Sequence, residues 1–63
     1  MTATAKDSVE TLLKTGVNNL HDINNSLTAL GFPQFQINLA IKSLIDEGYD
    51  VYEKNKQHFL VMV

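Results

Sequence analysis

Apolar residues recur at steps of three and four in three successive stretches of the chain, which is the spacing of one face of an α-helix. The three apolar stripes comprise Val9, Leu12 and Leu13; Leu20, Ile23, Leu27 and Leu30; and Ile37, Ala40, Ile41 and Leu44. A glycine follows each stretch, at positions 16, 31 and 48, and glycine just past a helix supplies the left-handed residue that ends it. The pattern predicts three helices within residues 5–48. Asp7 or Ser8 is expected to cap the first helix, and Pro33 is expected where the third begins.

After position 48 the period changes from helical to alternating, as in a β-strand. Residues 49–53 form the first predicted strand and residues 59–63 the second, joined by the polar residues 54–57. The four-residue connection predicts an antiparallel hairpin. Because an isolated hairpin is marginally stable in water, we expect this one to pack on the helices.

The two faces of the hairpin receive different predictions. The face expected to cover the helices carries Val51, Phe59, Val61 and Val63. The opposite face is expected to be exposed and carries Tyr52, Leu60 and Met62. A solvated sheet face should be polar, so these apolar side chains indicate a surface for oligomerisation or for a protein partner. The residues predicted to be buried together are Leu12, Ile23, Leu27, Leu30, Ile37, Ile41, Leu44, Val51, Phe59 and Val61.

With 63 residues the chain accommodates at most one domain, and residues 1–5 are small or polar and expected to fray. The predicted fold class is therefore α+β: three helices and a C-terminal hairpin in one domain spanning residues 1–63. No apolar run approaches the roughly 18 residues of a membrane span, and residues 1–10 lack the apolar stretch of a signal peptide. The default expectation is a cytoplasmic protein. So small a chain suits a phage, plasmid or other mobile element.

Two segments carry a resemblance to a known family. Residues 30–44, LGFPQFQINLAIKSL, look like the turn and third helix of a winged helix-turn-helix. Their continuation, IDEGYDVY at residues 45–52, resembles the passage from helix to wing in the N-terminal DNA-binding domain of biotin-operon repressors. The resemblance covers residues 5–63 and implies a three-helix winged fold that binds DNA. The chain departs from the family at Pro33 and Gln34, where a Ser/Thr cap followed by Arg or Lys is usual.

A DNA-binding interpretation assigns specific roles to polar residues of the third helix and the hairpin. Amide side chains pair bidentately with adenine, and lysines reach phosphates. The residues predicted to bind double-stranded DNA are Gln34, Gln36, Asn38, Lys42, Lys54, Asn55 and Lys56. A net charge of −2 and the absence of arginine count against this interpretation, because arginine makes the commonest base-specific contact. Dimerisation would raise the affinity of a weak binder.

The alternative interpretation is a protein-interaction module on the same fold. Phe35 and Leu39 are four residues apart and point away from the predicted core, so they contact either thymine methyl groups or another protein. Protein contact is favoured, because a DNA-binding surface usually carries charge. The predicted protein interface comprises Phe35, Leu39, Tyr52, Leu60 and Met62.

Catalytic and metal chemistry find no support in the sequence. There is no cysteine, and the two histidines, His21 and His58, lie in different elements without ligand spacing. Asp46 and Glu47 are adjacent at a helix end and diverge, so they cannot act as an acid–base pair. We therefore expect no enzyme activity, no small-molecule substrate, no metal and no cofactor. The leading hypothesis is a small DNA-binding regulator or accessory factor.

Overall fold

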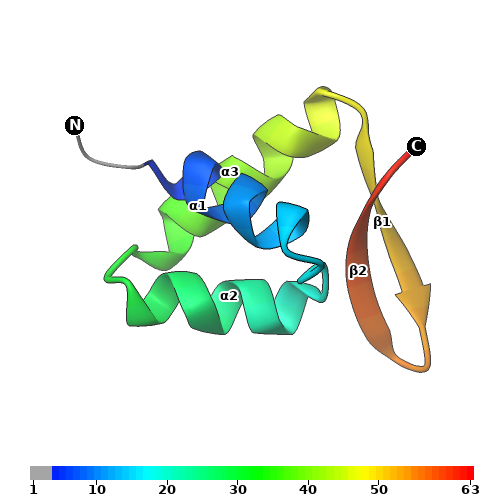
Figure 1. Cartoon of the computed structure of the whole chain (residues 1–63), viewed down its shortest axis with the longest axis horizontal. Helices are drawn as coiled ribbons and strands as arrows, with labels where there is room; N and C mark the ends of the chain where they lie inside the picture. The colour runs from blue at the N-terminus through cyan, green and yellow to red at the C-terminus, as the bar shows by residue number, and fades with distance from the viewer. Residues whose placement is uncertain (1–3) are drawn as a thin grey trace.

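The computed structural model describes residues 4–63 and contains three helices followed by a two-stranded sheet (Figure 1). The elements are α1 (Ala5–Lys14), α2 (Leu20–Ala29), α3 (Gln34–Asp46), β1 (Tyr49–Lys54) and β2 (Gln57–Met62). This order and the antiparallel pairing of β1 with β2 confirm the predicted α+β class with winged helix-turn-helix architecture. The hairpin of β1 and β2 is called the wing below.

Helix α1 begins earlier than the sequence predicted. Thr4 is its N-cap: the Thr4 hydroxyl accepts a hydrogen bond from the Asp7 amide at 3.1 Å, and the Asp7 carboxylate accepts one from the Thr4 amide at 3.4 Å. This reciprocal capping box satisfies two amides that have no partner within the helix. The expected cap at Asp7 or Ser8 is therefore wrong, and Ala5 is buried rather than frayed. Residues 1–3 of the segment expected to fray lie outside the described residues.

The turn between α2 and α3 shows why glycine follows a helix here. Gly31 has a φ of +96°, and its amide donates to the Thr28 carbonyl while the Phe32 amide donates to the Leu27 carbonyl. This pattern is a Schellman motif, which returns the chain toward the helix it has just left. Phe32 consequently packs against the core, and Pro33 is the N-cap of α3 rather than a residue of its first turn.

The wing turns more tightly than predicted. Lys54 pairs with Gln57, so the connection contains only Asn55 and Lys56. Both have positive φ, 52° and 64°, as a type I′ turn requires. Such a turn matches the right-handed twist of the strands, so β1 continues to Lys54 and β2 begins already at Gln57.

The wing is attached to the helices through the segment that precedes α2. Asn19 forms an isolated bridge with Phe59, and the Leu60 amide donates to the Asn18 carbonyl at 2.8 Å. Strand β2 thus lies between β1 and Asn18–Asn19. The pairing fixes which face of β2 meets the helices.

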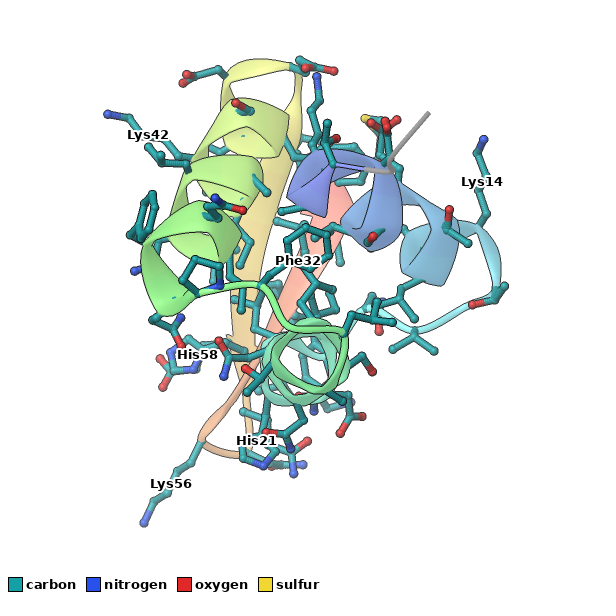
Figure 2. All side chains as sticks on the ribbon, turned by 90° about the vertical axis from the view of Figure 1, so that its left-hand side faces the viewer. Lys14, His21, Phe32, Lys42, Lys56 and His58 are labelled. Atoms are coloured by element: carbon teal, nitrogen blue, oxygen red, sulfur yellow. The ribbon has the colours of Figure 1, made fainter. Side chains whose placement is uncertain are left out.

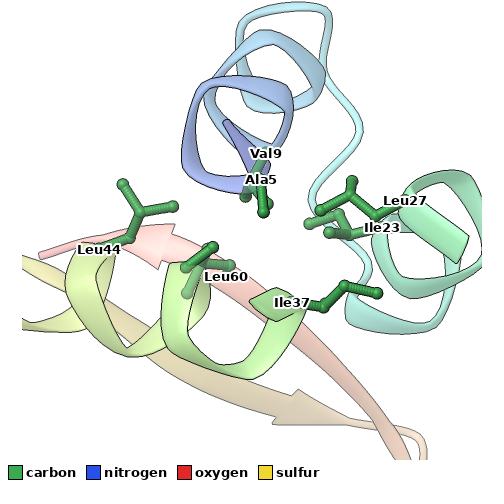
Figure 3. Packing of buried hydrophobic residues seen from close by; sticks show 8 residues of the cluster. Ala5, Val9, Ile23, Leu27, Ile37, Leu44 and Leu60 are labelled. Carbon is green, nitrogen blue, oxygen red and sulfur yellow. The ribbon is translucent and has the colours of Figure 1, made fainter. Parts of the chain in front are cut away.

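The core draws on all three helices and β2 (Figure 3). Its buried residues are Ala5, Val9, Ile23, Leu27, Ile37, Ala40, Leu44 and Leu60. Leu60 is 1% exposed, so its predicted place on the outer face of the wing is wrong. Val51, predicted to be buried, is opposite Leu60 in the register but 38% exposed. Phe59, Val61 and Ile41 are half-buried.

Two physical causes account for these corrections. Residues 59–63 are all apolar, so the sequence pattern does not indicate which face of the strand points toward the helices. The backbone hydrogen bond from the Leu60 amide to the Asn18 carbonyl determines that face. Leu30, also predicted to be buried, is 67% exposed. Leu30 is the C-cap of α2, where the helix ends. Phe32, two residues later, packs against the core instead of Leu30.

Replacing Leu60 by alanine should lower the free energy of unfolding by about 2–5 kcal/mol, because the lost side chain leaves a cavity in the core. Urea denaturation followed by circular dichroism measures the change. Met62→Ala is the matched control: Met62 is in the same strand but exposed, so its loss should change stability by less than about 0.5 kcal/mol. Equal effects of the two substitutions would contradict the observed burial.

Glycine at position 56 should stabilise the protein by about 0.5–1 kcal/mol, because Lys56 adopts a left-handed conformation that glycine adopts without steric cost. Thermal denaturation of Lys56→Gly tests this. Gln57→Gly, one residue later in β2, should have the opposite sign, since glycine within a strand is destabilising.

Candidate nucleic-acid interface

The sequence-predicted residues of α3 lie on its solvent-facing side. Ile37, Ala40 and Leu44 point into the core, so residues displaced by about half a turn point outward. Gln34, Gln36, Asn38 and Lys42 are all exposed. Phe35 and Leu39 are 62% and 58% exposed and occupy the middle of this outward side. We call the side of α3 that carries Phe35, Leu39, Lys42 and Asp46 its outer face.

The three amide side chains do not form one group. The Gln34 Nε2 donates to the Asn38 Oδ1 at 3.0 Å, one helical turn away, so these two lie together on one flank of the outer face. Gln36 lies on the other flank, where it lines a shallow hollow of about 240 Å³ with Lys6 and Ser43. The outer face therefore separates Gln36 from Gln34 and Asn38.

The wing supplies the second group of predicted residues. Lys54, Asn55 and Lys56 are exposed at its tip. Lys42, His58 and Lys56 lie toward one side of the molecule, and Lys14 lies on the opposite side (Figure 2). The structure thus directs a lysine of α3 and a lysine of the wing tip toward the same side.

A hollow of about 570 Å³ lies between the wing tip and the start of α2. It is lined by Asn19, Leu20, His21, Asp22, Lys56, Gln57 and His58. The side chain of Asn19 is hydrogen-bonded at both of its polar atoms. Its Oδ1 accepts from the backbone amides of His21 and Asp22, and its Nδ2 donates to Gln57 Oε1 at 3.2 Å. Two of the amides at the start of α2 that would attract an anion are therefore already partnered.

His21 and His58 line the same hollow, although they lie in different elements and the sequence does not predict that they are close. His58 Nε2 also lies 3.8 Å from a carboxylate oxygen of Glu53 across the wing. Within residues 4–63, however, no three side chains of His, Cys, Asp or Glu are grouped closely enough to hold a metal ion.

The charge along the segment from Lys42 to Lys56 is mixed. This segment carries three lysines, Lys42, Lys54 and Lys56, and four carboxylates. Those carboxylates belong to Asp46, Glu47, Asp50 and Glu53. Glu47 pairs with Lys6 of α1, and Asp50 Oδ1 accepts from the Val51 amide at 2.8 Å. Lys42 and Lys56 lie toward the same side of the molecule (Figure 2), and the four carboxylates lie between Lys42 and Lys54 in the sequence.

The predicted protein interface is divided by the structure. Leu60 is in the core and cannot contribute. Tyr52 and Met62 are exposed, but they lie on opposite faces of the wing, because Tyr52 pairs with Phe59 whereas Met62 pairs with Tyr49. Only Phe35 and Leu39 remain adjacent to one another.

One apolar groove was not predicted from the sequence. A groove of about 200 Å³ between α1 and α2 is lined by Asp7, Ser8, Thr11, Leu12, Ser26 and the exposed Leu30. Leu30 continues the apolar stripe of α2, so nothing in the sequence distinguishes it from a core residue.

Comparisons with protein-family models, with curated proteins and with solved structures gave no match for this chain. The class that the structure defines is the winged helix-turn-helix architecture. Within residues 4–63, no helix combines the length and the apolar content needed to cross a bilayer.

The pairing of Lys6 with Glu47 should appear as a loss of stability at alkaline pH. The hydrogen bond to the Glu47 carboxylate raises the pKa of Lys6 above its ordinary value, outweighing a smaller opposite effect of desolvation. A raised pKa stabilises the fold below the unfolded-state pKa, about 10.5, and this contribution disappears as pH rises through the folded-state value. Melting temperatures at about pH 8 and pH 11 of the wild type and of Glu47→Gln measure it. The difference between the two proteins should be small, since the pair is solvent-accessible, and should be smaller at the higher pH.

Proposed function

We propose that this protein binds double-stranded DNA, with α3 in the major groove and the wing tip against the phosphate backbone. The observation that supports the proposal is the arrangement of α3 and the wing. In this winged helix-turn-helix architecture, Lys42 of α3 and Lys56 of the wing tip lie toward the same side of the molecule, and Gln34 and Asn38 are exposed on α3. The likeness of residues 30–52 to biotin-operon repressors points in the same direction.

In this proposal some residues of α3 contact base edges, and the lysines of α3 and the wing contact phosphates. Gln34 and Asn38 meet base edges, because the N-terminal part of a recognition helix enters the groove deepest. Lys42, Lys54 and Lys56 contact phosphates, and Asn55 sets the turn that presents the two wing lysines. Gln36 lies on the far flank and contributes at most a marginal contact.

The small number of lysines limits the affinity of a single copy. Three phosphate contacts correspond to a slope of about −2.7 in a plot of log K against log salt concentration. This slope is much shallower than that of strong DNA-binding proteins. A dimer on two half-sites doubles the contacts and adds the advantage of a high effective concentration. We therefore propose that the protein acts as a homodimer and serves as a transcriptional regulator or accessory factor.

Replacing both wing lysines by alanine should weaken DNA binding to a similar extent for all sequences and flatten the salt dependence by up to about two units. The reason is that each lysine accounts for one released counterion. Titration of mixed-sequence duplex DNA by fluorescence anisotropy at several salt concentrations measures both effects.

Lys14→Ala is the matched control, because Lys14 is exposed on the opposite side of the molecule. It should leave the salt dependence unchanged. Absence of wild-type binding at about 50 mM salt, where electrostatic attraction is strong, would overturn the proposal.

A second candidate function is a protein-interaction module. The observation that favours it is the exposure of Phe35 and Leu39, in a chain whose five basic residues are outnumbered by seven acidic ones. In this case the two apolar side chains anchor a partner, and the wing lysines matter little.

The double substitution Phe35→Ala, Leu39→Ala separates the two functions. If a protein is bound there, association measured by sedimentation or pull-down should disappear, since buried apolar anchors commonly contribute more than about 1 kcal/mol each. The melting temperature should stay unchanged because neither side chain is part of the core. Association that survives the double substitution would exclude this candidate.

A further inference from the structure

The exposed side of α3 carries two parallel rows of side chains, each with a spacing of one turn. Gln34 and Asn38 form a hydrogen-bonded amide row. Phe35 and Leu39, each one residue later, form an apolar row, and both are more than half exposed. The rows begin at the first turn of α3, which is the part of a recognition helix that reaches base edges.

The amide row is arranged to read adenine. Gln34 uses one Nε2 hydrogen to reach Asn38 Oδ1 at 3.0 Å, so its second Nε2 hydrogen and its Oε1 remain available. Adenine offers in the major groove an N7 acceptor and an N6 amino donor, which match that remaining donor and acceptor. The bond to Asn38 also holds the Gln34 side chain, so less freedom is lost on binding.

The apolar row complements the other base of the same pair. Thymine presents a C5-methyl group in the major groove, and apolar side chains are its usual contact. A G·C pair has no methyl group there, and its polar groups would lose water without gaining a hydrogen bond if Phe35 or Leu39 covered them. The chain also lacks arginine, the commonest reader of guanine.

The size of the apolar row favours a thymine contact over a protein partner. A stable protein interface buries about 800 Å² on each partner. Phe35 and Leu39 are only two side chains, and the other exposed apolar residues of the predicted interface, Tyr52 and Met62, lie on opposite faces of the wing. Two neighbouring methyl groups in a groove need no larger surface.

We propose that the site on α3 is specific for A·T base pairs, with Gln34 on adenine and with Phe35 and Leu39 on thymine methyl groups. This specificity rests on the proposed DNA-binding function. It assigns the sequence preference to the major groove and to side chains, not to the wing.

Three duplexes of equal length test the proposal with the full chain at about 50 mM salt: one with an A·T core, one with a G·C core and one with an inosine·cytosine core. Inosine·cytosine resembles A·T in the minor groove and G·C in the major groove, because inosine lacks the guanine N2 amino group. Affinity for the A·T duplex should exceed both others by at least about tenfold, within the range of one bidentate base contact.

Replacing thymine by uracil in the A·T duplex removes only the methyl groups. Wild-type affinity should fall several-fold, and the Phe35→Ala, Leu39→Ala variant should bind both duplexes equally. Gln34→Ala should lose the A·T preference. Lys14→Ala, on the opposite side of the molecule, is the control and should keep the preference.

Each other outcome overturns the proposal in a distinct way. Equal affinity for A·T and G·C cores would remove the specificity and leave DNA binding intact. Inosine·cytosine bound as well as A·T would place the preference in the minor groove, and an absent uracil effect would exclude the methyl contact. Binding to no duplex would overturn the proposed function together with this inference. Loss of self-association in the Phe35→Ala, Leu39→Ala variant would show instead that the apolar row contacts a second copy of the chain.

Discussion

The attachment of β2 to the segment before α2 is the interaction on which the rest of this structure depends. The Leu60 amide donates to the Asn18 carbonyl, and Asn19 bridges Phe59. These contacts place Leu60 among Ile23, Ile37 and the other core residues (Figure 3). A two-stranded hairpin is marginal by itself, and the eight buried residues found among residues 4–63 make a small core. Leu60 therefore makes the wing part of the hydrophobic core, and the hydrogen bond between Asn19 and Gln57 connects the base of the wing turn to the start of α2.

The same attachment couples stability to the site proposed for DNA binding. Asn19 caps α2 through its Oδ1, holds Gln57 through its Nδ2 and pairs with β2 through its backbone. One residue thus fixes the start of a helix and the base of the wing turn. The positions of Lys54 and Lys56 follow from this junction and from the positive φ values of Asn55 and Lys56.

Electrostatics sets a limit on what the molecule can do. The chain has five basic residues, and Lys6 is paired with Glu47 and Lys14 lies on the far side. Only three lysines remain for a nucleic-acid backbone, beside four carboxylates on the same part of the chain. In the proposed complex with DNA, non-specific attraction is accordingly weak, so contacts in the groove would have to supply a larger share of the binding energy than in a basic protein. The adjacent amide and apolar rows of α3 are the side chains that can do so.

The sequence by itself determined the three helices, the change to strands after Gly48 and the exposure of the outer face of α3. These features depend on local periodicity and on glycine punctuation, which operate within a few residues. Only the tertiary structure decided that Leu60 points inward, that Leu30 is exposed, and that Gln36 is separated from Gln34 and Asn38. Residues 59–63 are apolar throughout, so both faces of β2 fit the pattern equally well. The choice between them rests on a hydrogen bond to Asn18, a residue about 40 positions away, and no local pattern contains that information.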